Sequence, residues 1–137
     1  MDYKYLKHTA DIKFQAFGNT IEDAFSSAAY ALKEVITDKE KIKNIEQKNI
    51  KITGKNIERL LYDFLEEFLF LLDAENFIFS KIKNIKIDIK NFILEATVMG
   101  DFNSKYNFVN SVKAITYNEM FVKKEKDKYI IQVVIDV

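Results

Sequence analysis

Apolar and polar residues alternate with a period of two along several short segments of the chain, which is the pattern of a β-strand with one buried face. Ile12, Phe14 and Ala16 are separated by single residues and are therefore expected to share one face. The same alternation predicts strands near residues 4–6, over 12–17 and over 49–53.

The alternation returns in the second half of the chain as a predicted β-hairpin. Residues 85–89 and 92–99 each show the period of two, and Asn91 between them is a typical turn residue. Gly100 and Asp101 follow the second strand, and we expect them to end it.

A last hairpin is predicted at the end of the chain. It joins residues 112–124 to residues 129–137 through a turn at Lys126–Lys128. The polar segment Asn103 to Asn110 precedes this hairpin and is predicted to be a long loop. Long loops inside compact domains are often functional.

Two segments instead space their apolar residues by three and four, as amphipathic helices do. The first begins at Thr20, whose hydroxyl can accept from a free backbone amide at the helix start. The second runs from about Asn56 to Asp73, and its broad apolar stripe leads us to expect the more deeply buried helix. The stripe of the first helix comprises Ile21, Ala24, Phe25, Ala28, Leu32 and Val35. The stripe of the second helix comprises Ile57, Leu60, Leu61, Phe64, Leu65, Phe68 and Leu72, and it is broadened by Tyr62, Leu69 and Phe70.

The predicted order of elements is ββαβα followed by four strands. The simplest packing for this order is an α+β fold in which a largely antiparallel β-sheet packs with two α-helices. We expect residues 1–137 to form a single compact domain, because the chain has no proline, only three glycines and no linker-like stretch. With 48% hydrophobic residues, the chain can build a substantial core.

Composition excludes several kinds of chemistry. The chain has no cysteine and a single histidine, His8, so a thiolate or multi-histidine zinc site is excluded. Lysine and arginine number 21, as do aspartate and glutamate, and Arg59 is the only arginine, so we expect no sequence-specific nucleic-acid binding. The longest apolar run is too short for a membrane span, and we expect a cytoplasmic protein without a signal peptide.

What remains is chemistry with oxygen ligands at the two ends of the chain. Asp11 precedes a predicted strand, and Asp136 follows the apolar run Val133–Ile135. If the two ends meet, these carboxylates and the carboxylate of Val137 could hold an ion such as Ca²⁺ or Mg²⁺. The residues alone leave ordinary alternatives open: Asp136 as a solvated strand end and Asp11 as a turn cap.

His8 and Lys113 are further candidates with equally ordinary alternatives. His8 lies three residues before Asp11, and Lys113 lies between a long loop and a strand, where it could position a phosphate. A surface or turn histidine and a solvated lysine would explain them as well.

Four segments, in order, resemble the archease family over the whole chain. The first, His8–Ile12 followed by Phe14, Ala16 and Gly18, is similar to the family's opening signature. Thr20–Ala29 resembles its first helix, Val112–Tyr117 a second signature, and Val133–Val137 its carboxy-terminal ending.

The chain departs from the family pattern at two places. Asn118 stands where family members often carry a histidine. The loop Asp101–Tyr106 lacks the histidine that is also common there. The aspartates of the signatures are intact.

The resemblance implies an accessory role. Archeases activate the GTP-dependent RNA ligase of tRNA splicing by promoting guanylylation of the ligase and its multiple turnover. The resemblance assigns a divalent metal ion (Ca²⁺ or Mg²⁺/Mn²⁺-like) to Asp11, Asp136 and Val137, ligase activation to Asp11, Lys113 and Asp136, and an accessory place to His8. It implies the ligase as partner and no catalytic residues.

Two other functional classes remain as alternatives. One is a small metal-dependent hydrolase that uses the same aspartates. The other is a general chaperone or RNA-binding modulator, for which Tyr106 and Phe108 of the long loop are the candidate contacts.

Overall fold

The computed structural model describes residues 2–8 and 10–137, so Thr9 of the first signature lies outside the described residues. These residues form seven strands and two α-helices in the predicted order. The strands are β1 (Asp2–Leu6), β2 (Ile12–Gly18), β3 (Glu46–Thr53), β4 (Phe77–Asp88), β5 (Ile93–Phe102), β6 (Ala114–Glu125) and β7 (Lys128–Asp136), and the helices are α1 (Ile21–Thr37) and α2 (Ile57–Ala74), with a short 3₁₀ turn at Asn103–Lys105.

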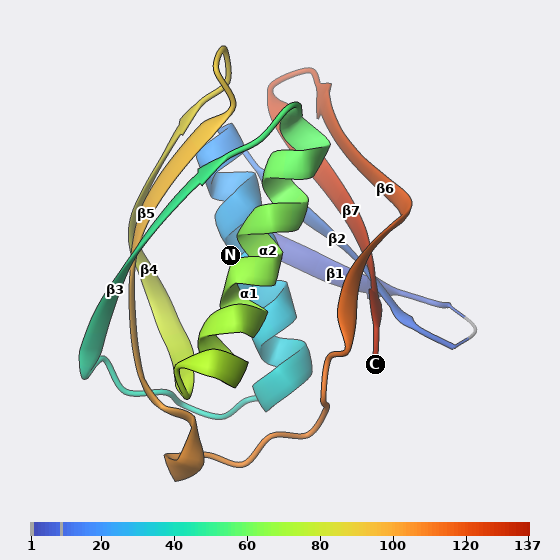
Figure 1. Cartoon of the computed structure of the whole chain (residues 1–137). Coiled ribbons are helices and arrows are strands. Elements are labelled where there is room, and N and C mark those ends of the chain that lie inside the picture. Colours follow the sequence, from blue (N-terminus) through green and yellow to red (C-terminus); the bar gives the residue numbers. More distant parts are fainter. Residues whose placement is uncertain (1, 9) are drawn as a thin grey trace.

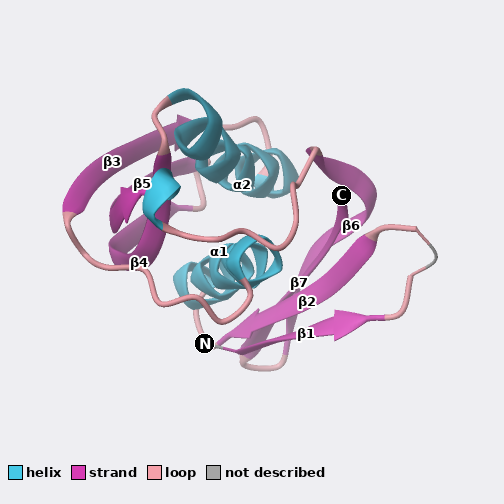
Figure 2. Cartoon of the chain, turned by 90° about the horizontal axis from the view of Figure 1, so that it is seen from below, coloured by secondary structure: helices cyan, strands magenta, loops and turns pink. Residues whose placement is uncertain are grey.

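The strands divide between two sheets, and both helices lie between them (Figure 1). The first sheet has the order β1-β2-β7-β6 and the second the order β3-β5-β4, and every neighbouring pair is antiparallel. The α+β prediction of two helices with an antiparallel sheet is confirmed, with the strands split between two sheets. The view from below shows the two helices side by side between the sheets (Figure 2).

Helix α1 is the more deeply buried helix, so the expectation that α2 would be is wrong. Small residues such as Ala24, Ala28 and Ala31 are fully buried and let α1 pack closely against both sheets. In α2 the centre of the predicted stripe is buried, Ile57 and Leu72 at its two ends are half-buried, and Phe70, which was expected to broaden it, is 53% exposed. Among the described residues, neither helix is long and apolar enough to cross a membrane.

Both predicted helix starts are confirmed by capping hydrogen bonds. The hydroxyl of Thr20 accepts from the amide of Asp23 at 3.0 Å. The side-chain oxygen of Asn56 accepts from the amide of Arg59 at 2.8 Å. Each bond satisfies one of the amides that the first helical turn leaves free.

Gly100 and Asp101 do not end a strand, contrary to the prediction. Both lie inside β5, which continues to Phe102. Glycine is required at position 100 by packing, because a Cβ there would collide with the carbonyl oxygen of Ile78 and the ring of Phe77 on β4. In this strand glycine therefore marks a close approach of side chain and backbone, and not a turn.

Candidate functional site

The first sheet brings the beginning and the end of the chain together. Strand β2 pairs with β7 so that Ile12 lies opposite Ile135. Continuing this register by one residue places Asp11 across from Asp136. The condition for a shared site, that both aspartates lie at the same end of neighbouring strands, is met by the backbone.

Lys113 and Val137 lie at the same end of the sheet. Ala114 pairs with Asp136, and the amide of Lys113 donates to the carbonyl oxygen of Asp136 at 2.7 Å. The side chain of Lys113 is exposed, and that of Asp136 is half-buried. The segments that meet here therefore carry all five candidate site residues from the sequence, which are His8, Asp11, Lys113, Asp136 and Val137.

Glu119 joins His8 to Lys13 beside this end of the sheet. One carboxylate oxygen of Glu119 lies 3.1 Å from Nε2 of His8, and the other accepts from Nζ of Lys13 at 3.0 Å. The hydrogen bond from Lys13, and to a smaller extent that with His8, holds the pKa of the Glu119 carboxyl below its usual range. Glu119 therefore carries a negative charge between two nitrogen groups from the N-terminal part of the chain.

A wide bulge in β6 positions Glu119. The pairing of β6 with β7 shifts between Thr116 and Phe121, and Glu119 within this bulge has a left-handed φ of 56°. Gln132 of β7 donates to the backbone oxygen of Glu119 at 2.8 Å and accepts from Gln15 of β2 at 2.9 Å. These bonds hold a conformation that costs a non-glycine residue about 1 kcal/mol or more.

His8 also faces Asp11. Its Nδ1 lies 3.8 Å from the nearest carboxylate oxygen of Asp11, beyond hydrogen-bonding distance. This nitrogen is buried and has no hydrogen-bond partner among residues 2–8 and 10–137.

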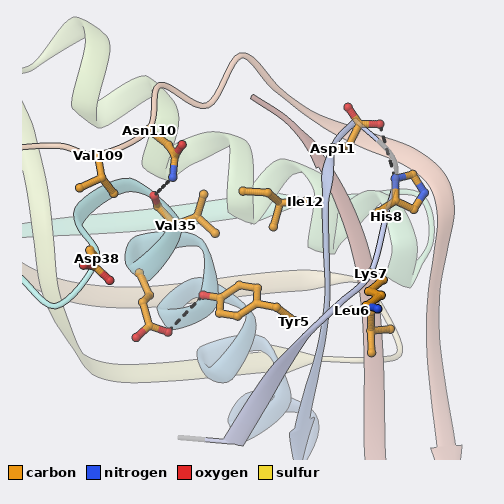
Figure 3. A pocket seen from close by; sticks show the side chains of 11 residues that line it. Tyr5, Leu6, Lys7, His8, Asp11, Ile12, Val35, Asp38, Val109 and Asn110 are labelled. Carbon is orange, nitrogen blue, oxygen red and sulfur yellow. Dashed lines mark hydrogen bonds and ion pairs between the residues drawn. The ribbon is translucent and has the colours of Figure 1, made fainter.

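His8 and Asp11 form one end of an open cleft of about 670 Å³ (Figure 3). Toward its other end, the hydroxyl of Tyr5 donates to the carbonyl oxygen of Ala31 at 2.8 Å and lies 3.2 Å from a carboxylate oxygen of Glu34. The hydroxyl of Tyr3, outside the cleft lining, donates to the same Glu34 oxygen at 2.7 Å. Burial and this carboxylate raise the pKa of Tyr3 to about 12. The cleft lies between the end of the first sheet and the C-terminal end of α1, and residues 109 and 110 form part of its wall.

The loop that carries residues 109 and 110 donates hydrogen bonds to backbone carbonyl oxygens at the C-terminal ends of both helices. The amide of Val109 donates to the carbonyl oxygen of Ile36, and the side chain of Asn110 donates to that of Val35. Asn103 similarly donates to the carbonyl oxygen of Leu72 in α2. Tyr106, a candidate contact of the chaperone or RNA-binding alternative, donates to Asp101 at 2.7 Å.

The side chains near the start of β2 and the end of β7 carry atoms of the types that bind divalent cations. They are too few to complete the coordination shell of such an ion. Asp11 and Asp136 supply carboxylates, and the unpartnered Nδ1 of His8 is a nitrogen donor beside them. Within the described part of the chain, however, no group of three or more histidine, aspartate or glutamate side chains is arranged to hold a metal ion. A complete coordination shell therefore needs ligands from outside these side chains.

Sequence reasoning missed Glu119 and Lys13. Glu119 follows Asn118 in what reads as an ordinary strand, and its bulge exists only because β6 pairs with β7. No local pattern in residues 112–124 indicates that this side chain reaches β2.

The comparisons with known proteins agree over nearly the whole chain. A family model described as the archease protein family matches residues 3–137. "Protein archease" of Methanosarcina mazei is 34% identical over 139 residues, covering 98% of this chain and 95% of that one. "Protein archease" of Sulfurisphaera tokodaii is 38% identical over 137 residues, with 98% of each chain covered.

Two solved structures resemble the fold. The solution structure of Methanobacterium thermoautotrophicum protein 1598 is similar with a TM-score of 0.84 and 34% identity, and the match covers 98% of both chains. A crystal structure of an archease from Thermotoga maritima, described as a possible chaperone, is similar with a TM-score of 0.61. At 20% identity over 98% of this chain and 96% of that one, this second likeness concerns the fold alone.

Proposed function

Because the chain belongs to the archease family, we propose that it activates the GTP-dependent RNA ligase of tRNA splicing. Its role is that of an accessory protein with no catalytic activity of its own. It promotes guanylylation of the ligase and thereby supports multiple turnover.

The observation that carries this proposal is the pairing of β2 with β7. Two segments 125 positions apart in sequence lie side by side, with Ile12 opposite Ile135, so Asp11 and Asp136 each lie one residue beyond this pair at the same end of the sheet. Antiparallel neighbours across a ladder have Cα atoms roughly 5 Å apart, so both carboxylates can approach one ion. The same end of the sheet carries Lys113 through its bond to Asp136.

Each residue has a distinct role in the proposed action. A divalent cation, when bound, supplies positive charge that neutralises and orients phosphate oxygens. Asp11 and Asp136 hold this charge at the edge of the molecule, where a partner can reach it. Lys113 adds an exposed ammonium group for the same phosphates.

The test is a guanylylation and multiple-turnover assay with purified ligase. Asp11→Ala and Asp136→Ala are expected to abolish activation, because each removes one of two carboxylates from the shared end. Lys113→Ala is expected to weaken activation at least tenfold. The matched control is Asp127→Ala, because Asp127 lies in the turn at the opposite end of the last hairpin.

The fold of every variant is checked by circular dichroism and thermal melting. Folded Asp11→Ala and Asp136→Ala proteins that still restore multiple-turnover ligation would refute the proposed roles of the two carboxylates. Metal-dependent nucleotide turnover by the chain without ligase, lost in the same variants, would favour a hydrolase instead.

A further inference from the structure

Residues 108–112 form a ridge between two clefts. The cleft of about 670 Å³ lies on the side of α1, and Val109 and Asn110 form part of its wall (Figure 3). A second cleft of about 330 Å³ lies on the side of α2, between residues 108–112 and the C-terminal end of that helix, where Leu69, Leu72 and Asp73 line it. The 108–112 ridge therefore has a hollow along each flank.

The 108–112 ridge exposes apolar side chains beside these hollows. Val109 is 59% exposed and Phe108 is 37% exposed, and Tyr5 in the wall of the larger cleft is 42% exposed. Single exposed apolar residues are ordinary, but several gathered around surface clefts mark a place where a partner binds. The ridge and its two clefts are therefore a candidate interaction surface.

Hydrogen bonds to α1 hold the backbone of the ridge in place. The amide of Val109 donates to the carbonyl oxygen of Ile36 at 2.8 Å, and the side chain of Asn110 donates to that of Val35 at 2.8 Å. A surface that is already ordered loses less conformational entropy when a partner binds. The exposed side chains of the ridge are thus presented from a fixed backbone.

The surroundings of the ridge are negatively charged. The C-terminal ends of α1 and α2 lie beside it, and a helix carries partial negative charge at this end. Neither helix has a basic residue in its last turn. Glu34, Asp38 and Asp73 line the two clefts, and none of them forms an ion pair with another residue in the described part of the chain. Their charge is left for a partner to neutralise.

This charge selects the kind of partner. The phosphates of a nucleic acid would meet carboxylates and negative helix ends, which disfavours RNA on this face. A second copy of the chain, paired symmetrically through the same surface, would bring the carboxylates of both copies together. A protein surface with an apolar centre and lysine or arginine side chains around it is complementary in both respects.

We propose that the 108–112 ridge and its two clefts form the docking surface for a basic, apolar-centred face of the RNA ligase. The inference rests on the proposed function and adds the face by which the chain is held. An enzyme that binds RNA and GTP carries positively charged surface for their phosphates. The larger cleft ends at His8 and Asp11, so a ligase seated on the ridge also reaches the end of the sheet proposed to activate it.

The experiment titrates the chain against a fixed amount of purified ligase and records the rate of guanylylation. A docking residue sets the half-saturating concentration of the chain, whereas Asp11 and Asp136 set the maximal rate. Val109→Asp is expected to raise the half-saturating concentration at least tenfold at an unchanged maximum, because it places a charge against an apolar partner surface. The matched control is Ile89→Asp: Ile89 is 49% exposed in the β4–β5 turn at the opposite end of the molecule (Figure 1), and this variant keeps the wild-type curve.

Asp73→Lys separates docking from folding. A lysine in the last turn of α2 interacts favourably with the helix dipole, so the melting temperature of the free chain is expected to rise. The half-saturating concentration is expected to rise several-fold as well, because a lysine repels a basic partner. Asp127→Lys, in the turn of the last hairpin, is the matched charge-reversal control and keeps the wild-type half-saturating concentration.

The outcomes distinguish this inference from the proposed function. If Val109→Asp and Asp73→Lys both activate with the wild-type half-saturating concentration, the docking surface is wrong and the roles of Asp11 and Asp136 stand. A lower maximum for Val109→Asp at an unchanged half-saturating concentration also overturns docking. If the wild-type chain does not activate the ligase, the proposed function fails, and calorimetry of the wild-type and Val109→Asp chains with ligase then tests docking alone: equal affinity, or no binding by either chain, overturns it.

Discussion

At the scale of single residues, Glu34 links the first strand to α1. Tyr3 donates to a carboxylate oxygen of Glu34 at 2.7 Å, the Tyr5 hydroxyl lies 3.2 Å from the same oxygen, and burial together with Glu34 raises the pKa of Tyr3 to about 12. A tyrosine whose pKa is higher in the folded chain stabilises the fold below the unfolded pKa, and this contribution disappears as the pH rises through the folded value. We therefore expect the free energy of unfolding to fall between about pH 10 and pH 12.

Glu34→Gln tests this interpretation. It removes the charge that disfavours tyrosinate, so tyrosine absorbance should begin to titrate at lower pH than in the wild type. The unfolding midpoint in denaturant should fall by less above pH 10.0 than in the wild type, because the folded tyrosine pKa of the variant lies closer to the unfolded value. Identical titration curves for the two proteins would show that Glu34 does not control these hydroxyls.

Residues differ in how far the sequence predicts their place. Asp11 and Asp136 were predictable, because strand periodicity and a family signature locate both ends of the sheet. Glu119 was not, since its position depends on a bulge and on Gln132, a side chain of another strand. Tyr106 was named from the sequence only as a candidate contact of the chaperone or RNA-binding alternative, and in the structure it anchors its own loop to the buried Asp101.

At the scale of elements, the loop from 103 to 113 acts as a cap for two helices. Neither helix has a basic residue in its last turn, and the loop supplies hydrogen-bond donors instead. Asn110→Ala removes the donor to the carbonyl oxygen of Val35 and should cost about 1 kcal/mol of unfolding free energy. Urea denaturation measures it, with exposed Ser111→Ala as the control. Equal stability of the two variants would contradict the capping role.

The close approach of β5 to β4 gives a second prediction for an element. Gly100→Ala places a methyl group against the backbone of Ile78 and the ring of Phe77, so we expect a loss of about 1–3 kcal/mol. Gly54→Ala is the matched control, because its nearest atoms lie at 3.1–3.4 Å, a contact that small shifts relieve. Denaturation curves compare the two, and similar losses would mean that position 100 is not specifically crowded.

Elements were predictable where their signal is local. Both helix starts follow from capping residues, and the strands follow from a period of two. The sequence did not reveal that the strands divide between two sheets, because sheet membership depends on pairing between distant segments. Gly100 shows the same limit: a glycine signals a turn or a close approach, and only the neighbouring strand decides which.

At the scale of the whole molecule, the helices couple two sheets that share no strand. Helix α1 contacts β2 and β7 of the first sheet and β4 of the second, and α2 contacts strands of both. The core face of β7, with Ile131, Val133 and Ile135, is fully buried against this layer. We therefore expect both sheets to unfold as one cooperative unit.

Native-state hydrogen exchange tests this coupling. The amides of β7 and of central β5 should exchange only through global unfolding, and amides in the 103–113 loop through smaller openings. Ile131→Val should lower the exchange free energy of β7 by about 0.5–1.5 kcal/mol, because it removes one buried methylene. The same decrease is expected at Leu94, Ala96 and Val98 in the other sheet, since no core strand opens without the helices. A decrease confined to β7 would show that the sheets unfold separately, and that the end of the sheet carrying Asp11 and Asp136 can open while β3, β4 and β5 stay folded.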